Sequence, residues 1–149
     1  MSERSRPLRI LLVDDNEIFL TAAGGWLSRQ PGLDLVATAG DGEEALAVLP
    51  TAKPDLVVMD TFMPGIGGLE ATRLIKSAPG APYVVMVSVH EGPAIEREAW
   101  AAGADGFVTK AELYAHLPAL IQELFATKPP SRGVSRSKSS AIQGEQGGQ

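Results

Sequence analysis

The chain has 149 residues, of which 44% are hydrophobic and 5% aromatic, so its length suits about one domain with a hydrophobic core. It contains no cysteine, which excludes disulfides and thiolate metal sites. The formal net charge is −5 at pH 7. An acidic body argues against nucleic acid as the main ligand, because phosphate backbones recruit basic surfaces.

The sequence carries no signal for export or for membrane insertion. The first seven residues are charged and lack the apolar stretch of a signal peptide. No apolar run approaches the roughly 20 residues that a membrane-spanning helix needs. We therefore expect a cytoplasmic protein with no membrane partner.

Strand and helix patterns alternate in chain order from residue 8 to residue 126. Asp41 is the expected N-cap of the second helix. The strand patterns are almost continuously apolar, which favours a parallel sheet covered by helices on both faces. The strands are expected at 8–13, 33–38, 55–59, 83–87 and 106–109, and the helices at 16–29, 40–49, 69–77, 93–102 and 111–125.

The composition changes at residue 127. Residues 127–149 are rich in Ser, Gly and Pro and poor in apolar residues. Such a segment cannot bury enough surface to offset the entropy lost on ordering, so we predict a disordered tail. A docking segment or a linker is the alternative. The tail contains one acid, Glu145, and four basic residues, which are Lys128, Arg132, Arg136 and Lys138.

Polar residues with complementary chemistry follow four of the predicted strands. Asp14 and Asp15 follow the first strand, Asp60 the third, Ser88 the fourth and Lys110 the fifth. Ligands of open α/β sheets bind outside the carboxyl ends of the strands, so these side chains are expected to meet. Three carboxylates, a hydroxyl and an ammonium suit a magnesium ion and a phosphoryl group.

Each of these residues also has an ordinary explanation. Adjacent acids are favoured at a helix N-terminus, and a strand-end serine or lysine is usually an unremarkable surface group. The joint order along the chain is the specific signal, because an acid pair, an acid, a hydroxyl and a lysine follow successive buried strands.

With these residues in place, residues 8–126 resemble the receiver (CheY-like) domains of bacterial two-component response regulators, and most of all those of the LuxR/NarL type. The resemblance is carried by residues 57–73, 10–16 and 102–110. It implies an α/β fold of the flavodoxin-like (βα)5 type, a doubly wound parallel sheet with strand order 2-1-3-4-5. That order sets strands one and three side by side.

The resemblance also implies roles for individual residues. Asp60 is the expected phosphoacceptor. Asp14, Asp15, Asp60 and the backbone carbonyl of Phe62 are the expected ligands of Mg²⁺. One of the two adjacent acids is expected to bind the ion directly and the other largely through water.

The remaining implied roles concern the phosphoryl group and the switch. Ser88 is the expected switch hydroxyl, Phe107 the aromatic residue that turns inward with it, and Lys110 the partner of the phosphoryl oxygens. The family usually has proline after this lysine, where this chain has Ala111. Because a non-proline cis peptide costs about 2.5–4 kcal/mol, no cis bond is assumed.

Three further residues flank the site where the family tunes the loss of its phosphoryl group. They are Phe62, Val89 and His90. Val89 stands where a smaller residue is typical and is expected to narrow access for water and phosphodonors. We therefore expect slow hydrolysis of the phosphorylated form.

These features predict a signalling domain of a phosphorelay rather than an enzyme. The expected phosphoryl source is a sensor histidine kinase or a phosphotransfer protein, and the expected output surface is formed by the fourth helix, fifth strand and fifth helix. We expect a stand-alone receiver that does not bind DNA directly, and homodimerisation is left open. The alternatives are a pseudo-receiver that never takes a phosphoryl group and a Mg²⁺-dependent phosphatase with an aspartate nucleophile.

Overall fold

The structure, a computed structural model, describes residues 6–126. The predicted tail at 127–149 lies outside the described residues. The strands are β1 (Leu8–Val13), β2 (Leu33–Ala39), β3 (Leu56–Asp60), β4 (Tyr83–Ser88) and β5 (Gly106–Thr109). The helices are α1 (Glu17–Ser28), α2 (Gly42–Ala52), α3 (Gly68–Lys76), α4 (Pro93–Ala101), the 3₁₀ turn η1 (Lys110–Glu112) and α5 (Leu113–Leu124).

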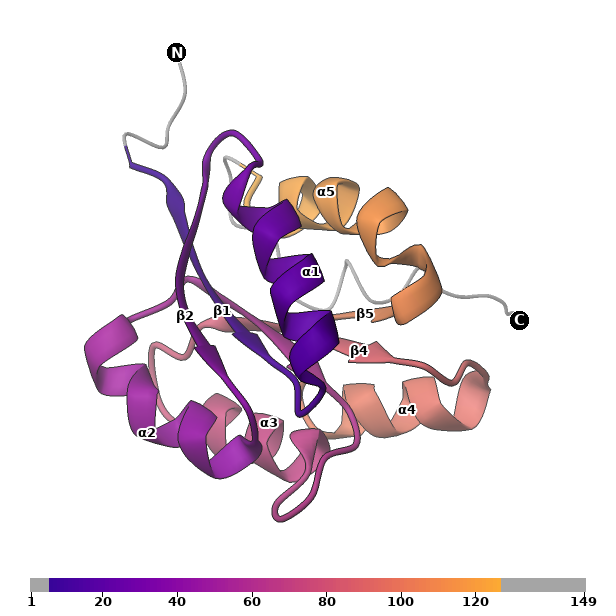
Figure 1. Cartoon of the computed structure of the whole chain (residues 1–149). Coiled ribbons are helices and arrows are strands. Elements are labelled where there is room, and N and C mark those ends of the chain that lie inside the picture. The colour runs from indigo at the N-terminus through magenta and orange to yellow at the C-terminus, as the bar shows by residue number, and fades with distance from the viewer. Residues whose placement is uncertain (1–5, 127–149) are drawn as a thin grey trace.

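The five strands form one parallel sheet in the order β2-β1-β3-β4-β5 (Figure 1). This order confirms the flavodoxin-like topology. Its consequence for function is the direct pairing of β1 with β3, in which Val13 lies opposite Met59. The residues that follow these two strands are therefore neighbours, although they are more than forty positions apart in sequence.

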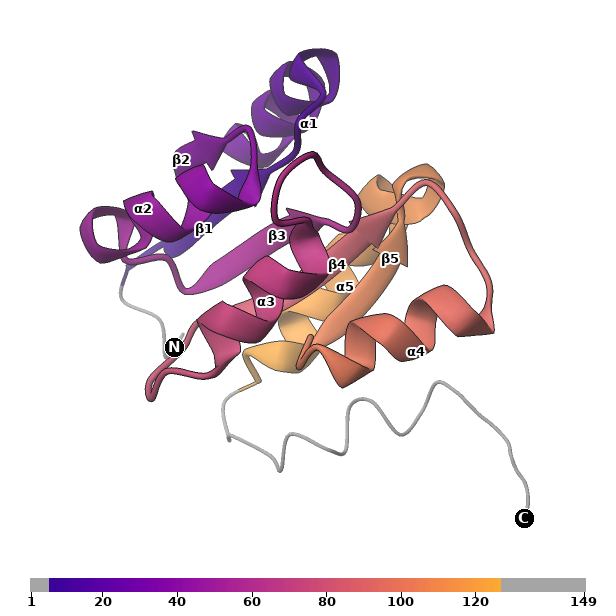
Figure 2. The same cartoon turned by 90° about the horizontal axis from the view of Figure 1, so that it is seen from below.

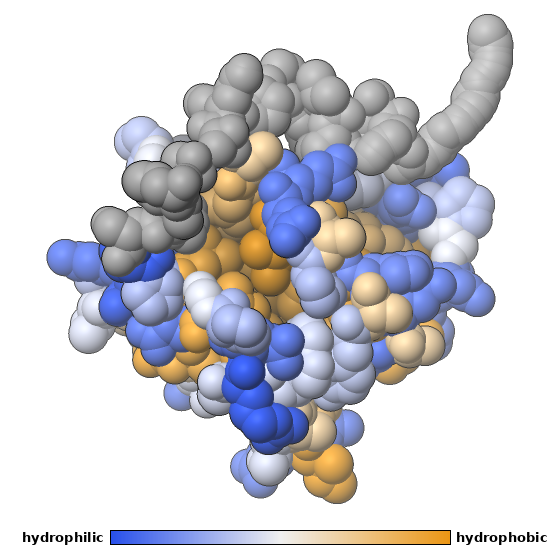
Figure 3. Space-filling view, turned by 90° about the horizontal axis from the view of Figure 1, so that it is seen from above, coloured by the Kyte–Doolittle hydropathy of each residue, from blue (hydrophilic) through white to orange (hydrophobic). Residues whose placement is uncertain are grey.

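Helices cover both faces of the sheet (Figures 1 and 2). Alternate residues of β1 point into opposite cores, as expected for a strand buried on both sides. Ile10 and Leu12 belong to the core beneath α1 and α5. Leu11 and Val13 belong to the core shared with α2, α3 and α4. Seen from the side of α1 and α5, the surface is mostly polar, with apolar residues gathered near its middle (Figure 3).

Most of the observed helix ends differ from the predicted ones by one to three residues, and the end of α2 differs most. Asp41 caps α2 as expected, since its side chain accepts from Glu44 N at 2.8 Å, but the helix continues past Pro50 to Ala52. Proline removes one hydrogen bond, yet its side chain is exposed and the buried Ala52 packs beyond it. The last helix begins later than predicted, because η1 precedes α5.

No helix within residues 6–126 combines the length and apolar character required to cross a lipid bilayer.

Candidate functional site

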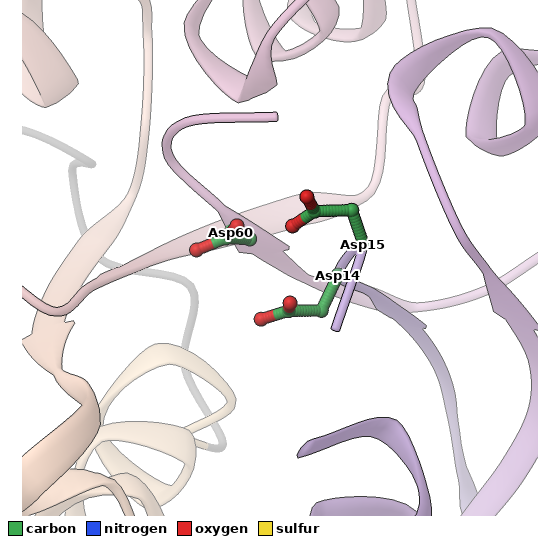
Figure 4. Close-up of side chains that lie close together, drawn as sticks. All are labelled: Asp14, Asp15 and Asp60. Atoms are coloured by element: carbon green, nitrogen blue, oxygen red, sulfur yellow. The ribbon is translucent and has the colours of Figure 1, made fainter. Parts of the chain in front are cut away.

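Three carboxylates meet where β1 and β3 end (Figure 4). Asp14 and Asp15 follow β1, and Asp60 is the last residue of β3. One oxygen from each lies within 4.8 Å of the others. Asp14 is fully buried and Asp60 is 7% exposed, whereas Asp15 is exposed. The pairing of the two strands therefore creates a compact acidic group with one side open to solvent.

Within residues 6–126, one ammonium group balances part of this negative charge. Lys110, in the turn η1 after β5, places its Nζ 2.7 Å from Asp14 Oδ2 and 3.9 Å from Asp60 Oδ1. The same Nζ lies 4.3 Å from the centre of the Phe19 ring on α1. Lys110 was predicted to serve the phosphoryl group, and the structure puts it nearest to Asp14.

The buried carboxylate of Asp14 has a partner on each oxygen. Its Oδ1 accepts a hydrogen bond from Asn16 N at 2.8 Å. Its Oδ2 is buried and is paired with the Lys110 ammonium at 2.7 Å. The positive charge at this oxygen is therefore supplied by a side chain that a metal ion would replace or share. Hard oxygens in this arrangement fit Mg²⁺, which binds carboxylates together with water.

Asp60 is held in an environment that opposes its negative charge. Burial, followed by the nearby charge of Asp14, raises the pKa of the Asp60 carboxyl from 3.8 to about 7. Lys110 acts in the opposite direction, and Asp15 adds to the increase. A cation placed among the three acids would therefore favour the ionised, nucleophilic form of Asp60.

Ser88 lies at the end of β4, next to β3. Its side chain is buried, and its Oγ accepts a hydrogen bond from His90 N at 3.0 Å. Asp60 pairs with Val87 across the two strands. The predicted acceptor and the predicted switch hydroxyl are therefore on adjacent strand ends.

Thr61 joins these two strand ends directly and was missed by the sequence reasoning. Both its backbone N, at 2.9 Å, and its Oγ1, at 2.8 Å, donate to the carbonyl of Val87. The side chain is 1% exposed. A threonine beside the acceptor was the available signal, but its partner on β4 could be identified only after the strands were paired.

The turn after Asp60 depends on a close helix approach. Gly68 N donates to Thr61 O at 2.9 Å, and a Cβ on Gly68 would lie only 1.8 Å from the carbonyl oxygen of Asp60. The other side of the turn is bound by Glu43, whose carboxylate accepts from Ile66 N at 3.3 Å. Only glycine fits at the first residue of α3, so α3 and α2 together position the Asp60 turn.

The three predicted rate-tuning residues lie in the loops that follow β3 and β4. Phe62 is 50% exposed and Val89 is 65% exposed. The rings of Phe62 and His90 lie edge to face, with centroids 6.3 Å apart. These residues follow Asp60 and Ser88 closely in the chain, and the two loops contact each other through the Phe62 and His90 rings.

Phe107, the predicted aromatic switch, is half-buried on β5 and packs against the core shared with α2, α3 and α4. It also lines a pocket of about 420 Å³ with Glu91, Pro93 and Glu112. This pocket lies between α4, β5 and the turn η1. The Lys110–Ala111 peptide bond is trans.

Comparisons with known proteins agree with this geometry. A family model described as the response regulator receiver domain matches residues 10–122. The chain is 42% identical over 120 residues to the response regulator GacA of Pseudomonas viridiflava, which covers 80% of this chain and 56% of that protein. It is 38% identical over 103 residues to the transcriptional regulatory protein UhpA of Escherichia coli, covering 69% and 51%. The chain thus spans about half the length of these curated relatives.

Solved structures show the same similarity. A two-component response regulator of the LuxR family from Aurantimonas sp. SI85-9A1 superposes with a TM-score of 0.76 at 36% identity, covering 89% of this chain and 96% of that one. The response regulator domain of Thermotoga maritima CheB superposes with a TM-score of 0.68 at 36% identity, covering 80% and 95%.

Proposed function

Since this chain belongs to the response regulator receiver family, a family of two-component signalling domains, we propose that it accepts a phosphoryl group on Asp60. The observation that carries the proposal is the position of this carboxylate, which ends β3 beside two further acids and 3.9 Å from Lys110. Asp60 is the member of the acid group that lies on a strand paired with β4, the strand that ends at Ser88.

The proposed donor is a phosphohistidine of a sensor kinase or of a phosphotransfer protein. A carboxylate oxygen of Asp60 attacks the phosphorus, the P–N bond breaks, and the histidine nitrogen leaves with the electron pair and then takes a proton. The product is an acyl phosphate on Asp60. The ammonium of Lys110 is close enough to move from Asp14 toward the added negative charge.

We further propose that Asp14, Asp15, Asp60 and the Phe62 carbonyl hold Mg²⁺. The bound ion would screen the repulsion between the carboxylates and the incoming phosphoryl group. The convergence of the three acids supports this assignment, because one oxygen of each lies within 4.8 Å of the others. Asp14 keeps Oδ1 on Asn16 N, and its Oδ2 already holds a cation, the Lys110 ammonium.

The proposed output is a shift between two conformations. Ser88 gives up its contact with His90 N and donates to the phosphoryl group, and Phe107 moves with it. The surface formed by α4, β5 and α5 changes as a result, and it is the proposed site for an output partner or for a second copy of the chain. The pocket lined by Phe107 supports this, since it lies within that surface.

We propose that Phe62, Val89 and His90 slow the hydrolysis of the acyl phosphate. What supports this is their exposure beside the strand ends that bear Asp60 and Ser88, and the contact between the Phe62 and His90 rings. The Phe62→Asn/Val89→Ala variant is expected to lose its phosphoryl group faster than the wild type. Decay is followed by intact mass after removal of the donor, and an equal or slower decay in the variant contradicts the assignment.

Intact mass spectrometry tests the acceptor. The protein is incubated with acetyl phosphate and Mg²⁺, and a mass gain of one phosphoryl group is expected in the wild type and in Asp34→Asn, a matched change of an exposed strand aspartate. No gain is expected in Asp60→Asn. A phosphoryl group retained in Asp60→Asn refutes this acceptor, and a wild type that never gains mass supports the pseudo-receiver instead.

A further inference from the structure

The Lys110 ammonium lies over the aromatic ring of Phe19, a residue to which the family resemblance assigned no role. Its Nζ lies 4.3 Å from the centre of the Phe19 ring. A cation this close to an aromatic face is attracted by the negative charge of the π system, most strongly when it is shielded from water. The Lys110 side chain is 19% exposed, and Phe19 is half-buried.

The first turn of α1 brings this ring into the site by a chain of short contacts. Asn16 N donates to Asp14 Oδ1 at 2.8 Å, and the Asn16 side chain accepts from Phe19 N at 3.0 Å as the helix cap. Asp14 and Phe19 are therefore fixed to each other through Asn16. The ammonium lies between them, 2.7 Å from Asp14 Oδ2.

A divalent cation and this ammonium compete for the same oxygen. Asp14 Oδ2 is buried, and its charge is balanced by Lys110 alone within residues 6–126. A Mg²⁺ ion bound to this oxygen would repel the ammonium and weaken its contact with Asp14. Whatever stabilises Lys110 at Asp14 therefore weakens the binding of Mg²⁺.

We propose that Phe19 is a positioning residue that holds the Lys110 ammonium on Asp14 in the metal-free protein and so sets the affinity for Mg²⁺. The inference rests on the proposed metal site. Mg²⁺ displaces Lys110 from both Asp14 and the ring, which leaves the ammonium available to Asp60. Phe19 thereby couples arrival of the metal to release of the lysine that meets the phosphoryl group.

The test is a Mg²⁺ titration followed by amide chemical shifts. Phe19→Leu keeps an apolar side chain of similar size but removes the aromatic face. The dissociation constant for Mg²⁺ is expected to fall about two- to five-fold, because cation–π contacts of this kind contribute about 0.5–1 kcal/mol. Phe19→Tyr keeps the face and is expected to bind Mg²⁺ like the wild type.

A double-mutant cycle separates this role from simple packing. In a Lys110→Gln background, Phe19→Leu is expected to leave the Mg²⁺ affinity unchanged, since no ammonium remains to be held. Phe125→Leu, which removes a ring packed on Tyr83 at the other end of α5, is the matched control and is expected to have no effect.

Three results overturn the inference. They are unchanged or weaker binding in Phe19→Leu, a shift in Phe19→Tyr as large as that in Phe19→Leu, and an equal shift in the Lys110→Gln background. A wild type whose amide shifts do not respond to Mg²⁺ refutes the metal site as well. Normal binding by the wild type with no effect of Phe19→Leu refutes only the role of Phe19.

Discussion

At the scale of single residues, Asp60 combines two properties that oppose each other. It must be ionised to act as a nucleophile, yet burial and its acidic neighbours raise the pKa of its carboxyl to about 7. Lys110 lowers the pKa of Asp60 only in part, because its ammonium lies closer to Asp14 than to Asp60. In the metal-free protein the acceptor is therefore held partly protonated at neutral pH.

This raised pKa makes stability depend on pH. A carboxyl whose folded pKa exceeds its unfolded value contributes stability that is fully present below about pH 4 and is lost as the pH rises through about 7. Between pH 5 and pH 8, the metal-free wild type is expected to lose about 2–3 kcal/mol of unfolding free energy from this group. Urea unfolding at the two pH values measures it.

Asp60→Asn provides the control for this effect. Asparagine does not titrate, so the variant is expected to lack this part of the pH dependence and to be more stable than the wild type at pH 8. If both proteins lose the same free energy between pH 5 and pH 8, Asp60 is not the titrating group.

At the scale of elements, the turn between β3 and α3 is held by the close approach of Gly68 to the Asp60 carbonyl. An added methyl group cannot be accommodated without moving the helix or the turn, because the atom it meets belongs to the backbone. Gly68→Ala is expected to destabilise the fold by about 1–3 kcal/mol and to slow phosphorylation of Asp60. Urea unfolding and the rate of mass gain with acetyl phosphate measure the two effects.

Gly25 in α1 is the matched comparison. A Cβ there lies 3.4 Å from the end of the flexible Arg29 side chain and meets no backbone. Gly25→Ala is expected to stabilise the protein by about 0.5–1 kcal/mol, because alanine is the better helix former. The opposite signs of the two substitutions are the prediction, and a harmless Gly68→Ala would show that the turn is not held in this way.

At the scale of the whole molecule, the acidic site connects metal binding to global stability. β1 and β3 each contribute residues to both cores, and the three acids lie at the ends of these strands. The carboxylates therefore repel one another at the ends of two strands that are buried on both faces. A ligand that removes the repulsion should stabilise the molecule as a whole.

Mg²⁺ is accordingly expected to raise the melting temperature. At ten times its dissociation constant, it should add about 1.4 kcal/mol of stability, which corresponds to roughly 5 °C for a domain of this size. Calorimetry with MgCl₂, against KCl of equal ionic strength, measures the shift. Asp14→Asn should abolish it and Asp34→Asn should retain it. A shift of equal size in KCl would show that only general screening is involved.

The order of the elements and the identity of the acidic residues could be predicted from the sequence, because both are local properties. Apolar runs of strand length, helix caps such as Asp41 and acids at strand ends are visible along the chain. The strand order followed from the family resemblance and is confirmed. The continuation of α2 past Pro50 was not predictable, because packing of Ala52 outweighs a local preference.

The sequence alone thus determined that three acids, a hydroxyl and a lysine belong to one edge of a parallel sheet. Only the tertiary structure decided that Lys110 lies on Asp14 rather than Asp60, that Phe19 faces the ammonium, and that Thr61 ties β3 to β4. Each of these contacts joins elements distant in sequence. Their geometry depends on strand pairing and on the packing of α1 against the sheet, and no local pattern encodes these.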